Sequence, residues 1–392
     1  MTSAMSDSTT TLIRGGQVHD GTGAPPQQLD VRINDREILE VGKGLPSNGN
    51  DVFDASDLIV APGLIDLHAH VYHGTGIYSI DPKQAGLKTG VTTLLDTGSA
   101  GALTYGTFHE YVMRYAQENI FALLNIAQPG VQGHPNIDPY LGDLFEIRHL
   151  HVPTAVECIK AYPDRILGTK VRLTASLAEH REANERAGLS GAVEAANQTG
   201  LLCMVHHLAS SIPQPEMLEA LRPGDIVTHV YHGQKDTGFS GPDGQPSKAM
   251  HQARDRGILF DVGHGVGSFT WRTAEPACQQ YGFWPDTIST DVHVFNLGGP
   301  VFDLPTTMTK FLYLGMSLEN VIQACTLSPA RAMKMESERG MIRPGMAAEI
   351  TTLRLLDGHF DLFDVDGQMR SASQRLIPVT VFHRGLCVQC DT

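Results

Sequence analysis

Eight short apolar runs, alternating with helix-like segments, predict an α/β protein: a (β/α)8 TIM barrel. The sequence pattern differs at both chain ends, where short strand-like stretches are separated by the turn-forming residues Gly, Pro, Asn and Asp. These ends predict a small β-sandwich domain built from residues 1–60 and 340–392, with the barrel spanning 61–339.

The barrel strands are expected where apolar residues run almost without interruption, which is typical of a parallel sheet buried on both faces. In chain order these runs are LIDLHAH (64–70), VTTLLDT (91–97), IFALLNIAQ (120–128), ILGTKVRL (166–173), LLCMVHH (201–207), DIVTHVYH (225–232), ILFDVGH (258–264) and TISTDVH (287–293). Intervening segments such as LSGAVEAANQTG, EMLEALRPG and MHQARDRG are helix-like and close with Gly. Eight such strands favour a closed barrel over an open sheet.

The composition of the chain limits which partners and which cellular compartment we expect. The net charge of −14 argues against a phosphate-backbone partner, so we expect no nucleic acid. The first residues lack a basic stretch followed by an apolar core, and no apolar run has the length of a bilayer. The six cysteines are scattered, apart from Cys387 and Cys390, which we interpret as two thiols near the chain end. We expect a cytoplasmic protein with no membrane partner; the oligomeric state, a homo-oligomer included, stays open.

Polar residues close each predicted strand, and in a (β/α)8 barrel the carboxyl ends of the strands form the active-site face. The residues concerned are His68, His70, Asp96, Asn125, Gln128, Lys170, His206, His229, His264 and Asp291. A helix cap or loop role explains Asp96 and Asn125 equally well. It does not explain a string of histidines.

The pair His68 and His70 is the first candidate for a metal site. Residues two apart on a strand face the same side, so both imidazoles can bind one divalent ion. His206 and His229 end two consecutive strands, and together they favour a second ion. Asp291 ends the last strand, where a carboxylate can bind metal and carry a proton between the attacking water and the leaving group.

Lys170 interrupts the fourth strand at the level of these ligands. A protonated lysine beside two dications is strongly disfavoured, whereas a neutral amine can capture CO₂ as an anionic carbamate that bridges both ions. The alternatives are a lysine that points to solvent or one that binds an anionic substrate.

Two further residues are candidates for substrate binding. Arg172 is able to hold a substrate carboxylate, although an ion pair with a protein carboxylate explains it equally well. His264 ends the seventh strand and is a substrate or proton-relay candidate. We place the remaining histidines, His207, His232 and His293, behind the site or on the surface.

These motifs resemble the amidohydrolase superfamily over nearly the whole chain. PGLIDLHAH is similar to its first-strand motif, and the order of the six ligands is similar to the binuclear subtype with a carboxylated lysine, which includes dihydroorotase, hydantoinase and phosphotriesterase. More narrowly, GVTTLLDTGSAG, GTKVR, GDIVTHVYHG, DVGHG and ISTDVH resemble a group labelled dihydroorotase or deacetylase, whose members hydrolyse acetylated small carboxylic acids.

The resemblance implies a metal-dependent hydrolase that cleaves an ester or amide bond of a small, anionic acylated acid with a metal-bridging hydroxide. It implies two divalent ions, with zinc favoured, held by His68, His70, Lys170 as its CO₂-derived carbamate, His206, His229 and Asp291. A cyclic amide hydrolase, such as a dihydroorotase or hydantoinase, shares every catalytic residue and remains the alternative. A catalytically silent barrel is disfavoured, because all six ligands are present.

Overall fold

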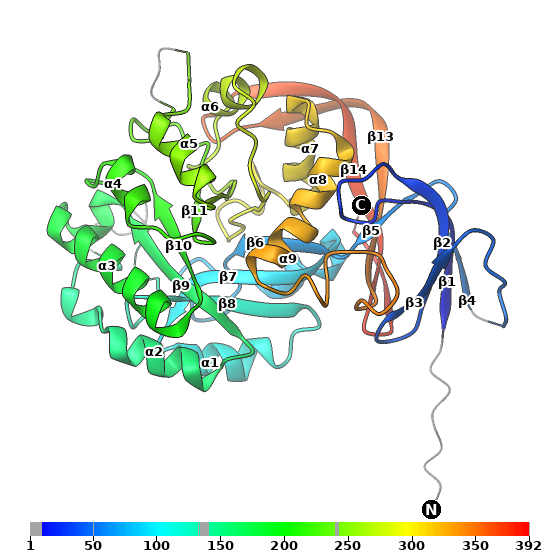
Figure 1. The fold of residues 1–392 in the computed structure, drawn as a ribbon, viewed down its shortest axis with the longest axis horizontal. Coiled ribbons are helices and arrows are strands. Elements are labelled where there is room, and N and C mark those ends of the chain that lie inside the picture. Colours follow the sequence, from blue (N-terminus) through cyan, green and yellow to red (C-terminus); the bar gives the residue numbers. More distant parts are fainter. Residues whose placement is uncertain (1–9, 50, 132, 134–140, 240–242, 392) are drawn as a thin grey trace, which may run out of the picture.

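Two sheets organise the computed structural model, which describes residues 10–49, 51–131, 133, 141–239 and 243–391 (Figure 1). Residues 1–9, 50 and 392 of the predicted terminal β domain lie outside the described residues. A curled parallel sheet fills the centre of the view, and a mixed sheet built from both chain ends lies at its right. No helix in the described part of the chain is long and apolar enough to cross a membrane.

The parallel sheet has seven strands in chain order, each hydrogen-bonded to the next. They are β6 (Leu64–Ala69), β7 (Val91–Gly101), β8 (Asn119–Asn125), β9 (Ile166–Leu173), β10 (Leu202–His207), β11 (Ile226–Thr228) and β12 (Leu259–Phe260). Every residue of β6, β7 and β8 is buried, which confirms that near-continuous apolar runs here form parallel strands covered on both faces.

The eighth predicted strand, residues 287–293, is not a regular strand. It nevertheless lies between the two edges of the parallel sheet, since Thr287 forms a parallel bridge with Asp261 and Val292 forms one with Ala69. Backbone hydrogen bonds from Asp291 N to His68 O (2.7 Å) and from His264 N to Ser289 O (3.2 Å) extend both contacts. The first and last strands of the sheet are therefore connected through this segment.

Helices surround the parallel sheet, most of them on its outer face, while the last helix closes the N-terminal end of its interior (Figure 1). They are α1 (Tyr105–Phe108), α2 (Val152–Ala161), α3 (Glu182–Thr199), α4 (Gln214–Glu219), α5 (Lys248–Asp255), α6 (Trp271–Glu275), α7 (Leu304–Leu314), α8 (Leu318–Ala324) and α9 (Leu327–Ala332). The three segments expected to be helical overlap α3, α4 and α5, each of which begins before the expected segment. Helix α3 is followed by Gly200, whose left-handed backbone (φ 69°) terminates the helix as expected.

Both chain ends join one mixed sheet. Its strands are β1 (Thr11–Val18), β2 (Gln27–Ile33), β3 (Ile38–Gly42), β4 (Asp51–Asp54), β5 (Ile59–Pro62), β13 (Glu349–Phe363), β14 (Met369–His383) and β15 (Leu386–Gln389). Hydrogen bonds connect all eight, so the expected sandwich of two sheets is replaced by a single sheet. That sheet folds around its own core, where Phe53 of β4 meets Phe382 of β14 edge to face at 5.1 Å.

The hairpin of β13 and β14 connects the two sheets. Near one end β13 pairs with β5, for example Thr352 with Val60. Farther along, Leu362 and Leu376 belong to the apolar core that the parallel sheet shares with its helices. The Leu376 backbone N–H also donates to Thr309 of α7 (3.1 Å), so this hairpin belongs to both packing units.

Alternation along the strands decides which side chains reach the inside of the curled sheet. On β10, Cys203 and Val205 pack outward under the helices. Leu202 and Met204 face the inner apolar core, whose N-terminal end is filled by residues of α9 and the turn after it. The next inward position is His206, which lines a cavity at the carboxyl end of the strands. The site is therefore built on top of an apolar plug.

Candidate metal centre

A cavity of about 320 Å³ opens at the carboxyl ends of the parallel strands. Its lining includes all six predicted metal ligands: His68, His70, Lys170, His206, His229 and Asp291. Cavities of this size bind small molecules.

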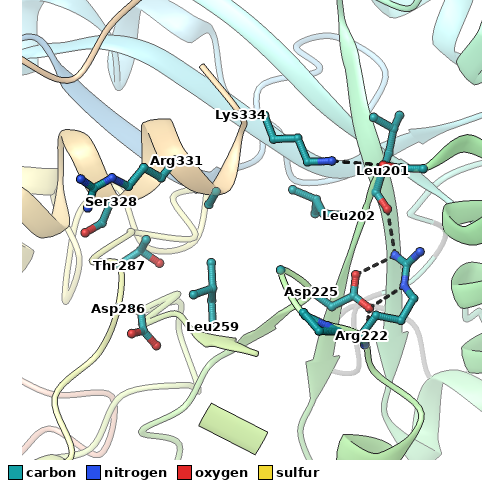
Figure 2. A pocket seen from close by; sticks show the side chains of 14 residues that line it. Leu201, Leu202, Arg222, Asp225, Leu259, Asp286, Thr287, Ser328, Arg331 and Lys334 are labelled. Atoms are coloured by element: carbon teal, nitrogen blue, oxygen red, sulfur yellow. Dashed lines mark hydrogen bonds and ion pairs between the residues drawn. The ribbon is translucent and has the colours of Figure 1, made fainter. Parts of the chain in front are cut away.

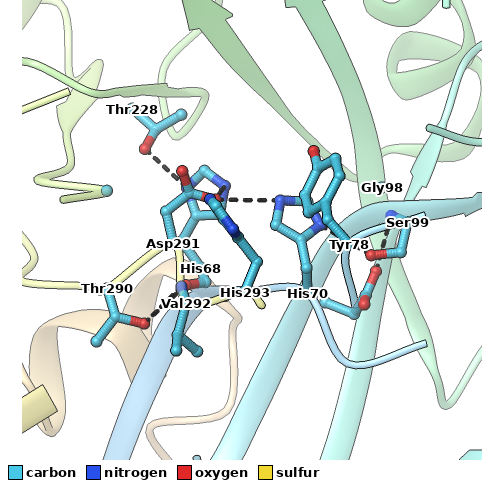
Figure 3. Close-up of polar contacts among 12 residues, drawn as sticks. His68, His70, Tyr78, Gly98, Ser99, Thr228, Thr290, Asp291, Val292 and His293 are labelled. Atoms are coloured by element: carbon cyan, nitrogen blue, oxygen red, sulfur yellow. Dashed lines mark hydrogen bonds and ion pairs between the residues drawn. The ribbon is translucent and has the colours of Figure 1, made fainter. Parts of the chain in front are cut away.

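His68, His70 and Asp291 form the centre of the site (Figure 3). The Nε2 atoms of His68 and His70 lie 3.2 and 3.1 Å from the same Asp291 oxygen, Oδ1. One ligand atom from each of His68, His229 and Asp291 lies within 4.8 Å of the others, as is required of residues that share an ion.

The opposite nitrogen of each of these imidazoles is held by the protein. His68 Nδ1 lies 2.9 Å from Thr228 Oγ1, and His70 Nδ1 lies 2.8 Å from Ser99 Oγ. His229 Nδ1 lies 2.6 Å from the carbonyl oxygen of Gly263, which can only accept a hydrogen bond. Nδ1 of His229 therefore carries the proton and Nε2 keeps its lone pair, which is how metal-binding histidines are oriented.

Burial keeps the imidazoles neutral, as metal binding requires. Desolvation lowers the pKa of His70 and of His229 to about 3, and it holds the pKa of His68 and His206 well below the ordinary value. Neutral imidazoles beside a carboxylate are a donor set that suits zinc and similar divalent ions, so these residues fit a metal.

Two of these ligands have backbone conformations that non-glycine residues rarely adopt. His229 has φ 68° and Asp291 has φ 50°, both in the left-handed region. Strand β11 ends at Thr228, immediately before His229. Gly265, in the DVGHG motif, leaves room for Asp291, because a Cβ there would lie 2.6 Å from Asp291 Oδ2. Such conformations cost about 1–3 kcal/mol each and concentrate at functional sites.

Lys170 points into the same cavity from β9. Its Nζ lies 3.4 Å from His68 Nε2 and 3.2 Å from Met204 Sδ, and the residue is 1% exposed. Desolvation lowers the pKa of Lys170 to about 7, so a neutral amine is accessible near neutral pH. Gly98 provides space for this side chain, since a Cβ on Gly98 would meet Lys170 Cγ at 2.9 Å.

His206 lies beside His229, but its Nε2 contacts a threonine hydroxyl and not the other candidate ligands. Its ring meets the ring of His229 edge to face, with centroids 4.4 Å apart. Its Nε2, however, is 3.0 Å from Thr174 Oγ1. His206 therefore lines the cavity without joining the triad of His68, His229 and Asp291, and its role as a ligand of a second ion stays a prediction.

Arg172 also lines the cavity, and the structure favours the ion-pair alternative for it. Its Nε and Nη2 lie 2.6 and 2.8 Å from the two carboxylate oxygens of Asp143, a bidentate contact. Nη1 donates to the Tyr78 hydroxyl (3.1 Å) and Nη2 to Gly133 O (2.7 Å). Much of the guanidinium is therefore committed to protein groups, and a direct substrate contact stays a prediction.

His264, the candidate for substrate binding or proton relay, does not line this cavity, and its role stays a prediction. Its Nε2 lies 2.6 Å from Nζ of Lys310 on α7, its Nδ1 lies 3.0 Å from Gly265 O, and the ring is fully buried. The neighbours Val266, Gly267 and Ser268 line the cavity instead. His264 anchors the loop that follows β12 to α7.

Several residues that support or line the site were not predicted from the sequence, because no motif marks them. Thr228 and Ser99 hold the histidines, and Tyr78 packs against both His70 and His293, with ring centroids 4.8 and 4.9 Å away. His293, which we had placed behind the site or on the surface, lines the cavity. His207 and His232 are buried outside the cavity lining, whereas Asp96 binds the backbone N–H groups of Val71 and Ser99.

A larger cavity, of about 520 Å³, lies at the opposite end of the parallel sheet (Figure 2). Several of its charged groups have partners close by: Arg222 donates to Asp225 at 2.7 Å, and Lys334 donates to the backbone oxygen of Gly200 at 3.2 Å. Leu201, Leu202 and Leu259 supply apolar lining. None of the described residues that line this cavity is a histidine.

Known proteins resemble this chain over most of its length. A deacetylase of Agrobacterium fabrum is 32% identical over 89% of this chain and 84% of its own, and a deacetylase of Brucella anthropi is 32% identical over 88% and 83%. Among solved structures, a dihydroorotase superposes with a TM-score of 0.85 at 29% identity over 98% of both chains. An adenine deaminase superposes with a TM-score of 0.88 at 25% identity over 97% of this chain and all of the other.

No family model matches the sequence. The two deacetylases nevertheless share about a third of their residues with this chain across more than four fifths of both lengths, and the chain has the fold of a dihydroorotase. The chain therefore belongs to the amidohydrolase superfamily, as a hydrolase related to these deacetylases.

Proposed function

We propose that this protein removes an acyl group, by ester or amide hydrolysis, from a small anionic carboxylic acid. The observation that carries the proposal is the convergence of His68, His70, His229 and Asp291, with each imidazole held through Nδ1 and Nε2 directed inward. The cavity of about 320 Å³ supports a compact substrate, and the resemblance to two deacetylases supports acyl transfer to water.

We further propose a binuclear centre, with zinc as the favoured ion. His68, His70, His229, His206 and Asp291 would hold the ions. When bound, they supply Lewis acidity, which lowers the pKa of water and polarises a carbonyl group. The eighth segment, 287–293, would then act as the last strand of a closed (β/α)8 barrel, with residues 61–339 as the catalytic unit and 1–60 with 340–392 as the accessory domain.

Lys170 completes the charge balance in this proposal. Two dications held by neutral imidazoles and one carboxylate would leave a large buried positive charge. The neutral amine of Lys170 adds to the carbon of CO₂ and releases one proton, which leaves a carbamate anion in the cavity. Its burial and its lowered pKa of about 7 support this addition.

Asp291 is the proton carrier in the proposed hydrolysis. Its side chain is 13% exposed, so it reaches both the buried imidazoles and the cavity that it lines. The carboxylate accepts the proton of the attacking water and returns it to the leaving alkoxide or amine. Tyr78 and His293 border the same space and restrict the size of the bound acid.

A substrate panel on the zinc-loaded protein tests the function. We expect turnover of O-acetyl or N-acetyl carboxylic acids, and a kcat lower by orders of magnitude in the Asp291→Asn variant. The second candidate, a cyclic amide hydrolase, is favoured by the close superposition with a dihydroorotase. Preferential hydrolysis of dihydroorotate or hydantoins over every acetylated acid would replace the first proposal with the second.

A further inference from the structure

A buried carboxylate lies behind the metal-facing imidazoles. Asp261, next to the carboxyl end of β12, is 0% exposed. Three hydroxyl groups, those of Thr228, Thr287 and Ser289, each lie 2.7 Å from one of its oxygens. Hydrogen bonds from hydroxyl donors stabilise an ionised carboxylate in the absence of water.

Thr228 connects this carboxylate to His68. Its hydroxyl has a single hydrogen, which it donates to Asp261 Oδ2, and it lies 2.9 Å from His68 Nδ1. Toward His68 the hydroxyl oxygen therefore accepts, and Nδ1 of His68 carries the proton. The lone pair of His68 is then on Nε2, the atom 3.2 Å from Asp291 Oδ1.

The other two histidines of the centre are held differently. His229 donates to a backbone carbonyl, which no side-chain substitution removes. His70 contacts the Ser99 hydroxyl, and the adjacent Asp96 interacts with the side chain and the backbone N–H of Ser99 and with the backbone N–H of Val71. For His68, the oxygen of the Thr228 hydroxyl must accept, because its single hydrogen is donated to Asp261.

We propose that Asp261 and Thr228 are positioning residues of the metal centre: together they hold His68 as its Nδ1–H tautomer. The inference rests on the proposed function, because it assumes that His68 Nε2 binds a metal. Loss of such an outer partner typically weakens metal affinity about 10–100-fold.

Zinc affinity, measured on the metal-free full chain by competition with a chromophoric chelator, provides the first test. Thr228→Val removes the hydroxyl at nearly constant volume, and Asp261→Asn gives Thr228 an amide donor that can reverse its hydrogen bond. We expect each to weaken zinc binding about 10–100-fold, and Thr228→Ser to stay within about threefold of the wild type. The double variant should be little worse than either single one, since both break the same chain.

Histidine-selective ¹⁵N NMR of the metal-free protein provides a readout that a merely structural role would not move. His68, assigned by the signals missing in His68→Gln, should be the Nδ1–H tautomer in the wild type and in Thr228→Ser. It should lose that preference in Thr228→Val and Asp261→Asn. Ser289→Ala is the matched control, because Ser289 also donates to Asp261 but Asp261 keeps its contact with Thr228.

Wild-type zinc affinity together with an unchanged His68 tautomer in Thr228→Val and Asp261→Asn would overturn the inference while leaving the proposed function intact. A wild-type protein that binds no zinc would instead reject the proposed function, and the NMR comparison would still decide the tautomer. Circular dichroism and thermal unfolding separate both results from misfolding, and Thr228→Ser tests the hydroxyl in a fold-preserving background.

Discussion

The two ends of the parallel sheet both carry a cavity, but the cavities differ in how their polar groups are used. At the N-terminal end, the cavity of about 520 Å³ is lined by charged side chains that include ion pairs, such as Arg222 with Asp225. At the carboxyl end, about 320 Å³ is lined by imidazoles whose inner nitrogens face each other and Asp291.

The difference shows that volume does not identify a functional cavity. Arg222 and Lys334 at the N-terminal end need no ligand, because each has a partner within the protein. Neutral imidazoles that converge on one carboxylate are expensive to bury, and an ion between them would recover that cost. Left-handed backbone does not follow this division, since His229 and Asp291 adopt it at the carboxyl end and Lys334 adopts it at the N-terminal cavity.

The largest expected difference between the two cavities concerns catalysis, which a substitution in the carboxyl-end cavity should impair. Asp291→Asn keeps an oxygen ligand but cannot accept a proton, so we expect kcat to fall about 10²–10⁴-fold while most of the metal is retained. Steady-state kinetics and elemental analysis of the same preparation measure both. Near-normal turnover would remove Asp291 from the mechanism.

Lys170 should affect metal binding and catalysis together. Lys170→Ala removes the amine that becomes the carbamate, so metal content should fall well below two ions per chain and kcat/KM should fall at least about 100-fold. Acetate or propionate, which can occupy the vacated space as an anion, should restore part of both. A plain amine in electron density of the zinc-loaded protein would contradict the carbamate.

Low pH should lower the stability of the metal-free protein, because a histidine buried at the carboxyl-end cavity becomes protonated more readily in the unfolded chain. The pKa of His229 is about 3 when folded and about 6.5 when unfolded, so between these values the unfolded chain binds more protons. Stability should therefore fall as the pH drops below about 6.5, by up to about 1.4 kcal/mol per pH unit for this residue.

His229→Asn provides the matched comparison, because Asn does not titrate and tolerates the positive φ at this position. Chemical denaturation of both metal-free proteins between about pH 4 and 7 should give a shallower pH dependence in the variant. Equal slopes would show that His229 is protonated alike in both states.

The smallest effect is expected at the N-terminal cavity. Arg331 is exposed there, and Arg331→Ala should change the free energy of unfolding by no more than about 0.5 kcal/mol, with unchanged kcat and metal content. Thermal unfolding and the kinetic assay check this. A tenfold loss of activity would show that the comparison between the two ends is wrong.

The sequence predicted the parts of this molecule that follow from periodicity. The strands were recognisable because residues buried on both faces must be apolar, and His68, His70, His206 and Asp291 were recognisable because they follow those runs. What could not be predicted depends on segments far apart in the chain. His264 contacts Lys310 on α7, and Arg172 forms an ion pair with Asp143 in a loop. Neither contact is marked by a motif in the sequence near either residue.

The same limit applies to the accessory sheet. Alternation and turn residues identified strands at both chain ends, but whether they form two sheets or one depends on pairings such as β5 with β13. Likewise, the left-handed backbone at His229 is imposed by its surroundings, because the local sequence offers no glycine at that position.

The pairing of Val60 with Thr352 has a consequence for how the chain is made. Strands β1 to β5 leave the ribosome early, yet β13 and β14, which complete their sheet, follow only after all the strands and helices between. Until then, apolar residues such as Ile13 and Val60 lack part of their final cover. Closing so long a loop is slow, so we expect the N-terminal strands to depend on chaperones or on transient contacts with the nascent barrel during synthesis.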